Sequence, residues 1–171
     1  AGFTVTDATM EKAMGMVEWP ARLQKLVEGK LLEFAPPGSE IWLDGGHNPA
    51  GGEVIAEAMA AFEERQPRPL YLVTGMINTK DPVGYFRAFA DLGEHVFTVR
   101  IRDSEAGLDP VVLANAAFDA GLVAEPAGST IEALQEITRR QLPGSPPPRI
   151  LIGGSLYFAG NVLADNGTPP V

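Results

Sequence analysis

Short apolar runs separated by glycine, proline and aspartate recur along the chain, and they predict buried strands. We expect these strands at residues 40–44, 70–74, 95–99, 122–124 and 149–152. The segment "RLQKLVEGKLLEF" is expected to add two short strands, one on each side of Glu28-Gly29.

Apolar residues at helical spacing lie between the expected strands. The clearest helix begins after Asn48, a good N-cap, with Pro49 at the first helical position. One face of it, which we expect to be buried, carries Val54, Ile55, Ala58, Met59 and Phe62. Further helices are expected at 7–17, at 82–90 after Asp81, at 110–120 after Asp109, from the capping box Ser129–Glu132, and after Ser155.

This alternation defines the fold class. Strands separated by helices of about 10 to 15 residues predict right-handed crossovers, hence an α/β fold with a mostly parallel sheet and helices on both faces. A length of 171 residues with 45% hydrophobic content suits one domain. In open sheets of this kind, ligands bind beyond the carboxyl ends of the strands.

Three loops at predicted strand ends have an unusual composition. They are "DGGHNP" at 44–49, "TGMINTKDP" at 74–82 and "GGSLY" at 153–157. Each combines glycine, which permits close backbone approach, with side chains that form hydrogen bonds. Tight turns and helix caps would explain any one of them, but three such loops at one sheet edge favour a ligand site.

Individual residues in these loops suggest specific roles. Asp44 has the position of an acceptor for ribose hydroxyls or of a carboxylate facing a metal, and the alternative is an aspartate in a surface-exposed turn. His47 lies near a helix N-terminus, where a phosphate or carboxylate is favoured, although a structural role is equally consistent with the sequence. Ser155 opens a helix after two glycines, where its hydroxyl and nearby N–H groups suit a carboxylate.

Three further charged or titratable residues are candidates of differing strength. Lys80 lies between a strand and a capped helix, so its ammonium group can meet an anion at the same edge. Arg22 follows Trp19-Pro20 at a position typical of interdomain linkers. His95 begins a strand without companions, and we interpret it as structural.

Composition excludes several function classes. The net charge of −9 argues against a binder of duplex DNA or anionic membranes. There is no cysteine and there are two histidines, which excludes thiolate chemistry and disfavours a multi-histidine metal site. The chain lacks a P-loop, a G-x-G-x-x-G fingerprint and a Gly-x-Ser-x-Gly elbow, so a self-contained kinase or hydrolase is hard to build from it. No signal pattern or long apolar run is present, and we expect a cytoplasmic protein.

Four segments in a fixed order carry a family resemblance. They read "WPARLQKL" at 19–26, "IWLDGGHNPAGG" at 41–52, "TGMINTKD" at 74–81 and "IGGSLYFAGNVL" at 152–163. Together they resemble the carboxy-terminal domain of folylpolyglutamate synthase/dihydrofolate synthase, of the Mur ligase superfamily. The resemblance covers roughly residues 1–165, and the pair of Trp-Pro-x-Arg with Asp-Gly-x-His-Asn-Pro is specific. Gly46 stands where alanine is usual.

The resemblance implies a Rossmann-like domain that closes over ATP in a larger ligase. Residues 1–18 would then be the tail of the preceding ATP-binding domain, 19–29 the hinge and first strand, and 30–171 the ligase domain itself. The central domain of the family holds the P-loop and Mg²⁺, so this chain would hold no metal and would be inactive alone. The implied partners are that domain, L-glutamate and a dihydropteroate or folate, with no nucleic acid or membrane partner, in a monomeric enzyme.

The resemblance also implies roles for individual residues. Arg22 would reach the ATP phosphates, Asp44 the ribose, and His47 and Asn48 the nucleotide, with His47 also near glutamate. Lys80 and Ser155 would face the carboxylates of glutamate. Two alternatives stay open, namely a non-catalytic α/β module that binds a nucleotide or a protein partner, and another Mur-type amino-acid ligase. The choice between dihydrofolate synthase, folylpolyglutamate synthase and a bifunctional enzyme also stays open.

Overall fold

Strands and helices alternate through residues 21–169, the part of the chain that the computed structural model describes. The elements are β1 (Gln24–Leu26), the 3-10 helix η1 (Lys30–Glu33), β2 (Glu40–Leu43), α2 (Pro49–Arg65), β3 (Leu70–Thr74), α3 (Pro82–Arg87), β4 (Gly93–Thr98), α4 (Pro110–Asp119), β5 (Ala124–Pro126), α5 (Thr130–Arg140), β6 (Arg149–Gly153) and α6 (Leu156–Asn166). The helix expected at 7–17 and the Trp19-Pro20 pair lie outside the described residues.

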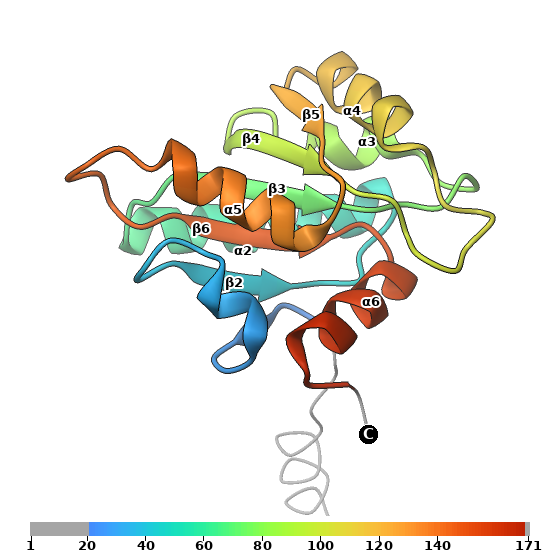
Figure 1. Cartoon of the computed structure of the whole chain (residues 1–171). Helices are drawn as coiled ribbons and strands as arrows, with labels where there is room; N and C mark the ends of the chain where they lie inside the picture. The colour runs from blue at the N-terminus through green and yellow to red at the C-terminus, as the bar shows by residue number, and fades with distance from the viewer. Residues whose placement is uncertain (1–20, 170–171) are drawn as a thin grey trace, which may run out of the picture.

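These strands form one sheet in the order β1-β2-β6-β3-β4-β5 (Figure 1). Strands β2 to β6 pair in parallel, whereas β1 pairs antiparallel with β2 at the edge. Because β6 enters between β2 and β3, the last strand in the sequence occupies the middle of the sheet. The predicted α/β class with a mostly parallel sheet is confirmed.

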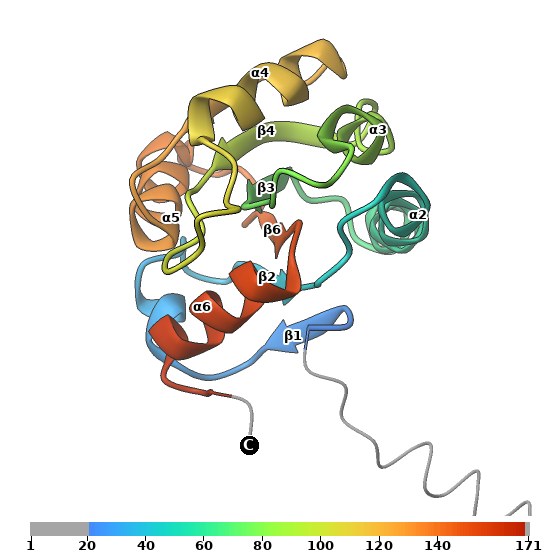
Figure 2. The ribbon, with the colours of Figure 1, turned by 90° about the vertical axis from the view of Figure 1, so that its right-hand side faces the viewer.

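Helices cover both faces of the sheet. Figure 2 shows α2 and α3 on one side and α5 and α6 on the other. The side chains of β6 alternate accordingly, because Ile150 and Ile152 pack with α5 and α6, whereas Leu151 packs with α2, α3 and α4. The largest fully buried side chains include Phe86 and Phe158, one in each core. The molecule is therefore a three-layer α/β/α domain.

Helix α2 begins as the sequence predicts. The Asn48 side chain accepts a hydrogen bond from the Gly51 N–H at 2.7 Å, and Pro49 follows as the first helical residue. The buried face is narrower than expected, since it consists of Gly52, Ile55, Ala56 and Met59. The expectation for Val54 is wrong: this side chain is 68% exposed, because it lies about 100° around the helix from Ile55.

The strand expected after Glu28-Gly29 is not formed, and residues 30–33 make the 3-10 helix η1 instead. Gly29 has φ of +112°, which turns the chain away from the direction of β1. The buried side chain of Asn166 accepts from the Leu31 N–H at 3.1 Å and donates to the Glu28 carbonyl at 2.9 Å. These backbone groups are therefore bonded to α6 and are not free to pair with a strand.

The strand expected at 122–124 lies two residues later, as β5. The Leu122 N–H instead closes the end of α4 by donating to the Ala117 carbonyl at 3.0 Å, and its side chain is buried beneath that helix. Only the residues beyond it are free to extend the sheet beside β4.

We expect Asn166→Ala to lower the free energy of unfolding by about 1–3 kcal/mol, because it leaves buried backbone groups of the 28–31 turn without partners. Asn78→Ala is the matched control, since Asn78 is exposed and should tolerate the same change. Urea denaturation of both variants measures the difference. Equal stabilities would show that the contact between α6 and the turn contributes nothing.

Candidate functional site

Three of the loops singled out in the sequence meet at one edge of the sheet. They follow β2, β6 and β3, which are neighbours in the sheet, and Figure 2 views the molecule from the side at which these strands end. Backbone hydrogen bonds continue past the strands and join the loops, from Asp44 N–H to Ile152 O at 3.0 Å and from Gly75 N–H to Gly153 O at 3.1 Å. The predicted convergence of these loops is confirmed.

Glycine is required where the loops approach most closely. Gly154 has φ of +102°, and a Cβ on it would lie 2.9 Å from the Gly75 carbonyl oxygen. A Cβ on Gly153 would lie 2.8 Å from the carbonyl oxygen of Asp44. A Cβ on Gly45 would overlap the Leu156 side chain. A side chain at any of these three glycines would therefore collide with atoms of a neighbouring loop or helix.

Asp44 is buried, with 6% of its surface exposed. Its Oδ2 accepts from the Leu23 N–H at 2.7 Å and its Oδ1 from the Gly46 N–H at 2.6 Å. The alternative of a surface-exposed turn aspartate is therefore wrong. Burial, with the Asp44 carboxylate as a further cause, raises the pKa of the nearby Tyr85 hydroxyl far above its ordinary value. Tyr85 therefore stays protonated beneath the site.

His47 and Asn48 lie just beyond Asp44, at the start of α2. One ring nitrogen of His47, Nδ1, lies 3.0 Å from the Gly45 carbonyl oxygen, which fixes the orientation of the half-buried ring. Asn48 is exposed and uses its side-chain oxygen to cap α2. The N-terminal end of α2 thus adjoins the loop, where the helix dipole favours an anion.

Arg22 lies on the same side, in the segment that leads into β1. Its exposed guanidinium Nη1 donates to the Ala21 carbonyl at 3.3 Å and would lie 3.1 Å from a Cβ on Gly45. The residues on either side of it, Ala21 and Leu23, have φ of +56° and +45°. Left-handed backbone costs roughly 1–2 kcal/mol for a residue with a side chain. Sequence reasoning missed this strain, because neither residue is glycine or asparagine, and the Trp-Pro-x-Arg motif marks only its place.

Lys80 lies in the loop after β3, just before the N-cap of α3, and Ser155 is the N-cap of α6, two residues after β6. Lys80 is half-buried and takes part in none of the ion pairs found in residues 21–169. Ser155 is 2% exposed, and its hydroxyl oxygen accepts from the Tyr157 N–H at 3.2 Å as the cap of α6. The first turn of α3, which follows Lys80, adjoins the start of α2, since a Cβ on Gly84 would lie 2.7 Å from Pro49 Cγ.

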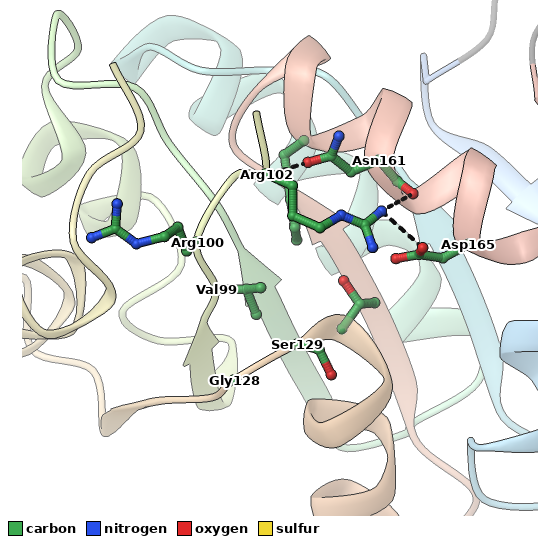
Figure 3. A pocket seen from close by; sticks show the side chains of 9 residues that line it. Val99, Arg100, Arg102, Gly128, Ser129, Asn161 and Asp165 are labelled. Atoms are coloured by element: carbon green, nitrogen blue, oxygen red, sulfur yellow. Dashed lines mark hydrogen bonds and ion pairs between the residues drawn. The ribbon is translucent and has the colours of Figure 1, made fainter. Parts of the chain in front are cut away.

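A separate cleft lies between the start of α5, α6 and the segment after β4 (Figure 3). Arg102 spans it, with Nη2 2.8 Å from Asp165 Oδ1 and its backbone N–H donating to Asn161 at 2.9 Å. Arg100 points away from this pair and bonds Asp109 at 3.2 Å. Both guanidinium groups are therefore already paired with carboxylates. Sequence reasoning missed this cleft, because no motif marks the residues that line it.

His95 is the third residue of β4, before the carboxyl end of the strand, and lies away from the three loops. Its Nε2 lies 3.3 Å from Arg140 Nη1, and its ring packs against Phe97. Burial and the positive charge of Arg140 lower the pKa of His95, so the ring is neutral at pH 7. These contacts fit the structural interpretation.

Two negative observations concern residues 21–169. No group of three or more His, Cys, Asp or Glu side chains gathers there in a way that suits a metal ion. No helix in this range has the length and apolar content needed to cross a lipid bilayer.

Comparison with known proteins shows which proteins the chain is similar to. No family model matches the chain. Over 159 residues it is 29% identical to the folylpolyglutamate synthase of Lacticaseibacillus casei, a match that covers 92% of this chain and 32% of that protein. The resemblance seen in the sequence is thereby confirmed, and the part of the enzyme that it concerns is the carboxy-terminal domain.

Solved structures agree on the fold. The folylpolyglutamate synthase of Mycobacterium tuberculosis, complexed with ADP and AMPPCP, aligns with a TM-score of 0.77 and 21% identity over 98% of this chain and 36% of that one. Escherichia coli FolC, in complex with DHPP and ADP, aligns with a TM-score of 0.72 and 18% identity over 95% and 35% of the two chains. The chain therefore spans about a third of the length of the relatives it matches.

We expect Gly45→Ala to lower the free energy of unfolding by about 1–3 kcal/mol, because the added methyl group must displace Leu156 and crowd Arg22. Gly160→Ala is the control: it lies within α6 with no atom within 4 Å of the added Cβ, and should raise stability by about 0.5–1 kcal/mol. Thermal denaturation of the two variants distinguishes the signs. Stabilisation by both changes would contradict the close packing of the loop.

Proposed function

We propose that this chain is the carboxy-terminal domain of an ATP-dependent ligase that joins L-glutamate to a dihydropteroate or folate carboxylate. The observation that carries the proposal is the similarity to a folylpolyglutamate synthase over 92% of the chain, with Arg22, Asp44 and His47 gathered at one edge. In the proposed domain arrangement, residues 1–18 end the preceding domain, 19–29 contain the hinge and 30–171 form the ligase domain. The enzyme would act as a cytoplasmic monomer.

The proposed reaction forms an amide through an acyl phosphate. The γ-phosphoryl group of ATP passes to an oxygen of the pteroate or folate carboxylate, which releases ADP. The amino group of glutamate then attacks the acyl carbon, and the tetrahedral intermediate expels phosphate while the nitrogen loses a proton. Such chemistry depends mainly on positioning and on neutralising charge, which are tasks for fixed loops.

Each residue at the edge has a role in this proposal. Arg22 binds ATP phosphates, His47 and Asn48 lie along the nucleotide, and Asp44 belongs to the same ATP site beside Arg22. Lys80 and Ser155, with His47, orient the carboxylates of glutamate. By the resemblance, Mg²⁺ would be held mainly by the preceding domain, and none of the roles given to these residues depends on it.

We expect the purified 171-residue chain to fold but to hydrolyse no ATP with glutamate and dihydropteroate. The reason is that its sequence contains no P-loop to hold the transferred phosphate. The longer protein that contains this chain should form the glutamyl product under the same conditions, as measured by phosphate release and mass spectrometry. Ligase activity of the 171-residue chain alone would refute the proposal that the active site is shared with the preceding domain. If the longer protein binds nucleotide but forms no product, a non-catalytic module is favoured.

In the longer protein, Lys80→Met should raise the KM for glutamate by about tenfold or more, which corresponds to roughly 1.4 kcal/mol of binding. The substitution keeps an apolar stem but removes the ammonium group that neutralises a substrate carboxylate. Lys30→Met serves as control, because Lys30 is an exposed lysine of η1. If the KM for ATP rises instead, Lys80 belongs to the nucleotide site.

A further inference from the structure

The backbone around Arg22 is held in an unfavourable conformation. Within residues 21–169, Ala21, Leu23 and Asp103 are the non-glycine residues with positive φ, and two of these three flank Arg22. Left-handed conformations at residues with side chains persist only where surrounding contacts impose them. The contacts around residues 21–23 therefore show what holds Ala21 and Leu23 at positive φ.

Three hydrogen bonds fix the segment. The Leu23 N–H donates to Asp44 Oδ2 at 2.7 Å, and the Gly45 N–H donates to the Ala21 carbonyl at 2.8 Å. The Ala21 N–H donates to Gln24 Oε1 at 3.1 Å. Two of these bonds come from the loop after β2, so that loop and the Arg22 segment are held together before β1 begins its pairing with β2 at Gln24 and Leu43.

Asp44 is the centre of this arrangement. One oxygen of its buried carboxylate binds the Leu23 N–H, and the other binds the Gly46 N–H at 2.6 Å. Replacing the carboxylate removes both bonds at once. Leu23 would then relax toward negative φ, which reorients the peptide groups next to it and with them the direction of the Arg22 side chain.

We propose that Asp44 is a positioning residue: it holds Leu23 in a left-handed conformation, next but one to the left-handed Ala21, and thereby aims Arg22 at the nucleotide. The inference rests on the proposed function for the identity of the ligand, but not for the backbone restraint itself. This role differs from a direct contact between Asp44 and the ribose, because Asp44 would affect ATP binding only through the main chain of Leu23 and the direction of Arg22. Both carboxylate oxygens already accept a protein N–H, which favours this assignment.

Glycine at position 23 gives a direct test in the longer ligase. Glycine adopts positive φ without steric cost, so Leu23→Gly should compensate for the lost carboxylate. We expect Asp44→Ala to raise the KM for ATP about tenfold, and Asp44→Ala/Leu23→Gly to return it to within about threefold of Leu23→Gly alone. The control is Asp44→Ala/Val27→Gly, since Val27 is exposed and just beyond β1. If neither glycine restores ATP use, the positioning role is wrong.

A double-mutant cycle with Arg22 provides a second test. If Asp44 acts through Arg22, then Asp44→Ala should change the KM for ATP less than about twofold in an Arg22→Ala background. If Asp44 contacts ATP independently, the two effects multiply, and the inference is overturned.

Amide hydrogen exchange in the 171-residue chain gives a readout that does not depend on ligase activity. The N–H groups of Leu23 and Gly46 should be protected in the wild type and exchange at least about tenfold faster in Asp44→Ala. Asp44→Asn keeps one carbonyl oxygen and should expose one of the two N–H groups. The Val73 N–H in β3 reports global unfolding, and it should lose less protection than the N–H groups of Leu23 and Gly46. Unchanged protection of Leu23 would overturn the inference even if the ligase activity is confirmed.

Discussion

The pairing of β6 between β2 and β3 is the constraint on which the candidate site depends. Segments more than 70 residues apart in the chain share an edge because Asp44 bonds Ile152 and Gly75 bonds Gly153 through their main chains. The glycines of the three loops allow these backbones to touch, as the close contact between Gly153 and Asp44 shows. The site is therefore a product of sheet topology, and the loops have little freedom to form it in another way.

Asp44 links the loop after β2 to the segment that precedes the edge strand β1. Strand β1 has three residues and pairs only with β2, so its own pairing fixes the preceding segment weakly. The buried carboxylate supplements that pairing through Leu23 and Gly46. On the other side of β1, Asn166 of α6 bonds the main chain at Glu28 and Leu31. The segment 23–31, which includes β1, is thus held at both ends by buried polar side chains.

Much of the fold, and the meeting of the three loops that form the candidate site, could be predicted from the sequence. Caps such as Asn48 and Ser129 are local signals, and parallel strands place the loops that follow them on one edge. The 3-10 helix at Lys30–Glu33 could not be predicted, because it depends on Asn166, which is more than 130 residues away. The strain at Leu23 was equally hidden, since a non-glycine residue gives no sign of positive φ until its partner is placed.

The electrostatics of the edge follow from the same hydrogen bonds. The chain has a net charge of −9, which by itself would repel a polyphosphate or a dicarboxylate. The acidic side chains at the edge are already occupied, however, because Asp44 binds two N–H groups and Asp81 caps α3. Arg22 and Lys80 form none of the ion pairs within residues 21–169, and the N-terminus of α2 faces the same loop. Arg22 and Lys80 thus add positive charge that no ion pair in this range uses, which favours an anion at this edge of an otherwise acidic protein.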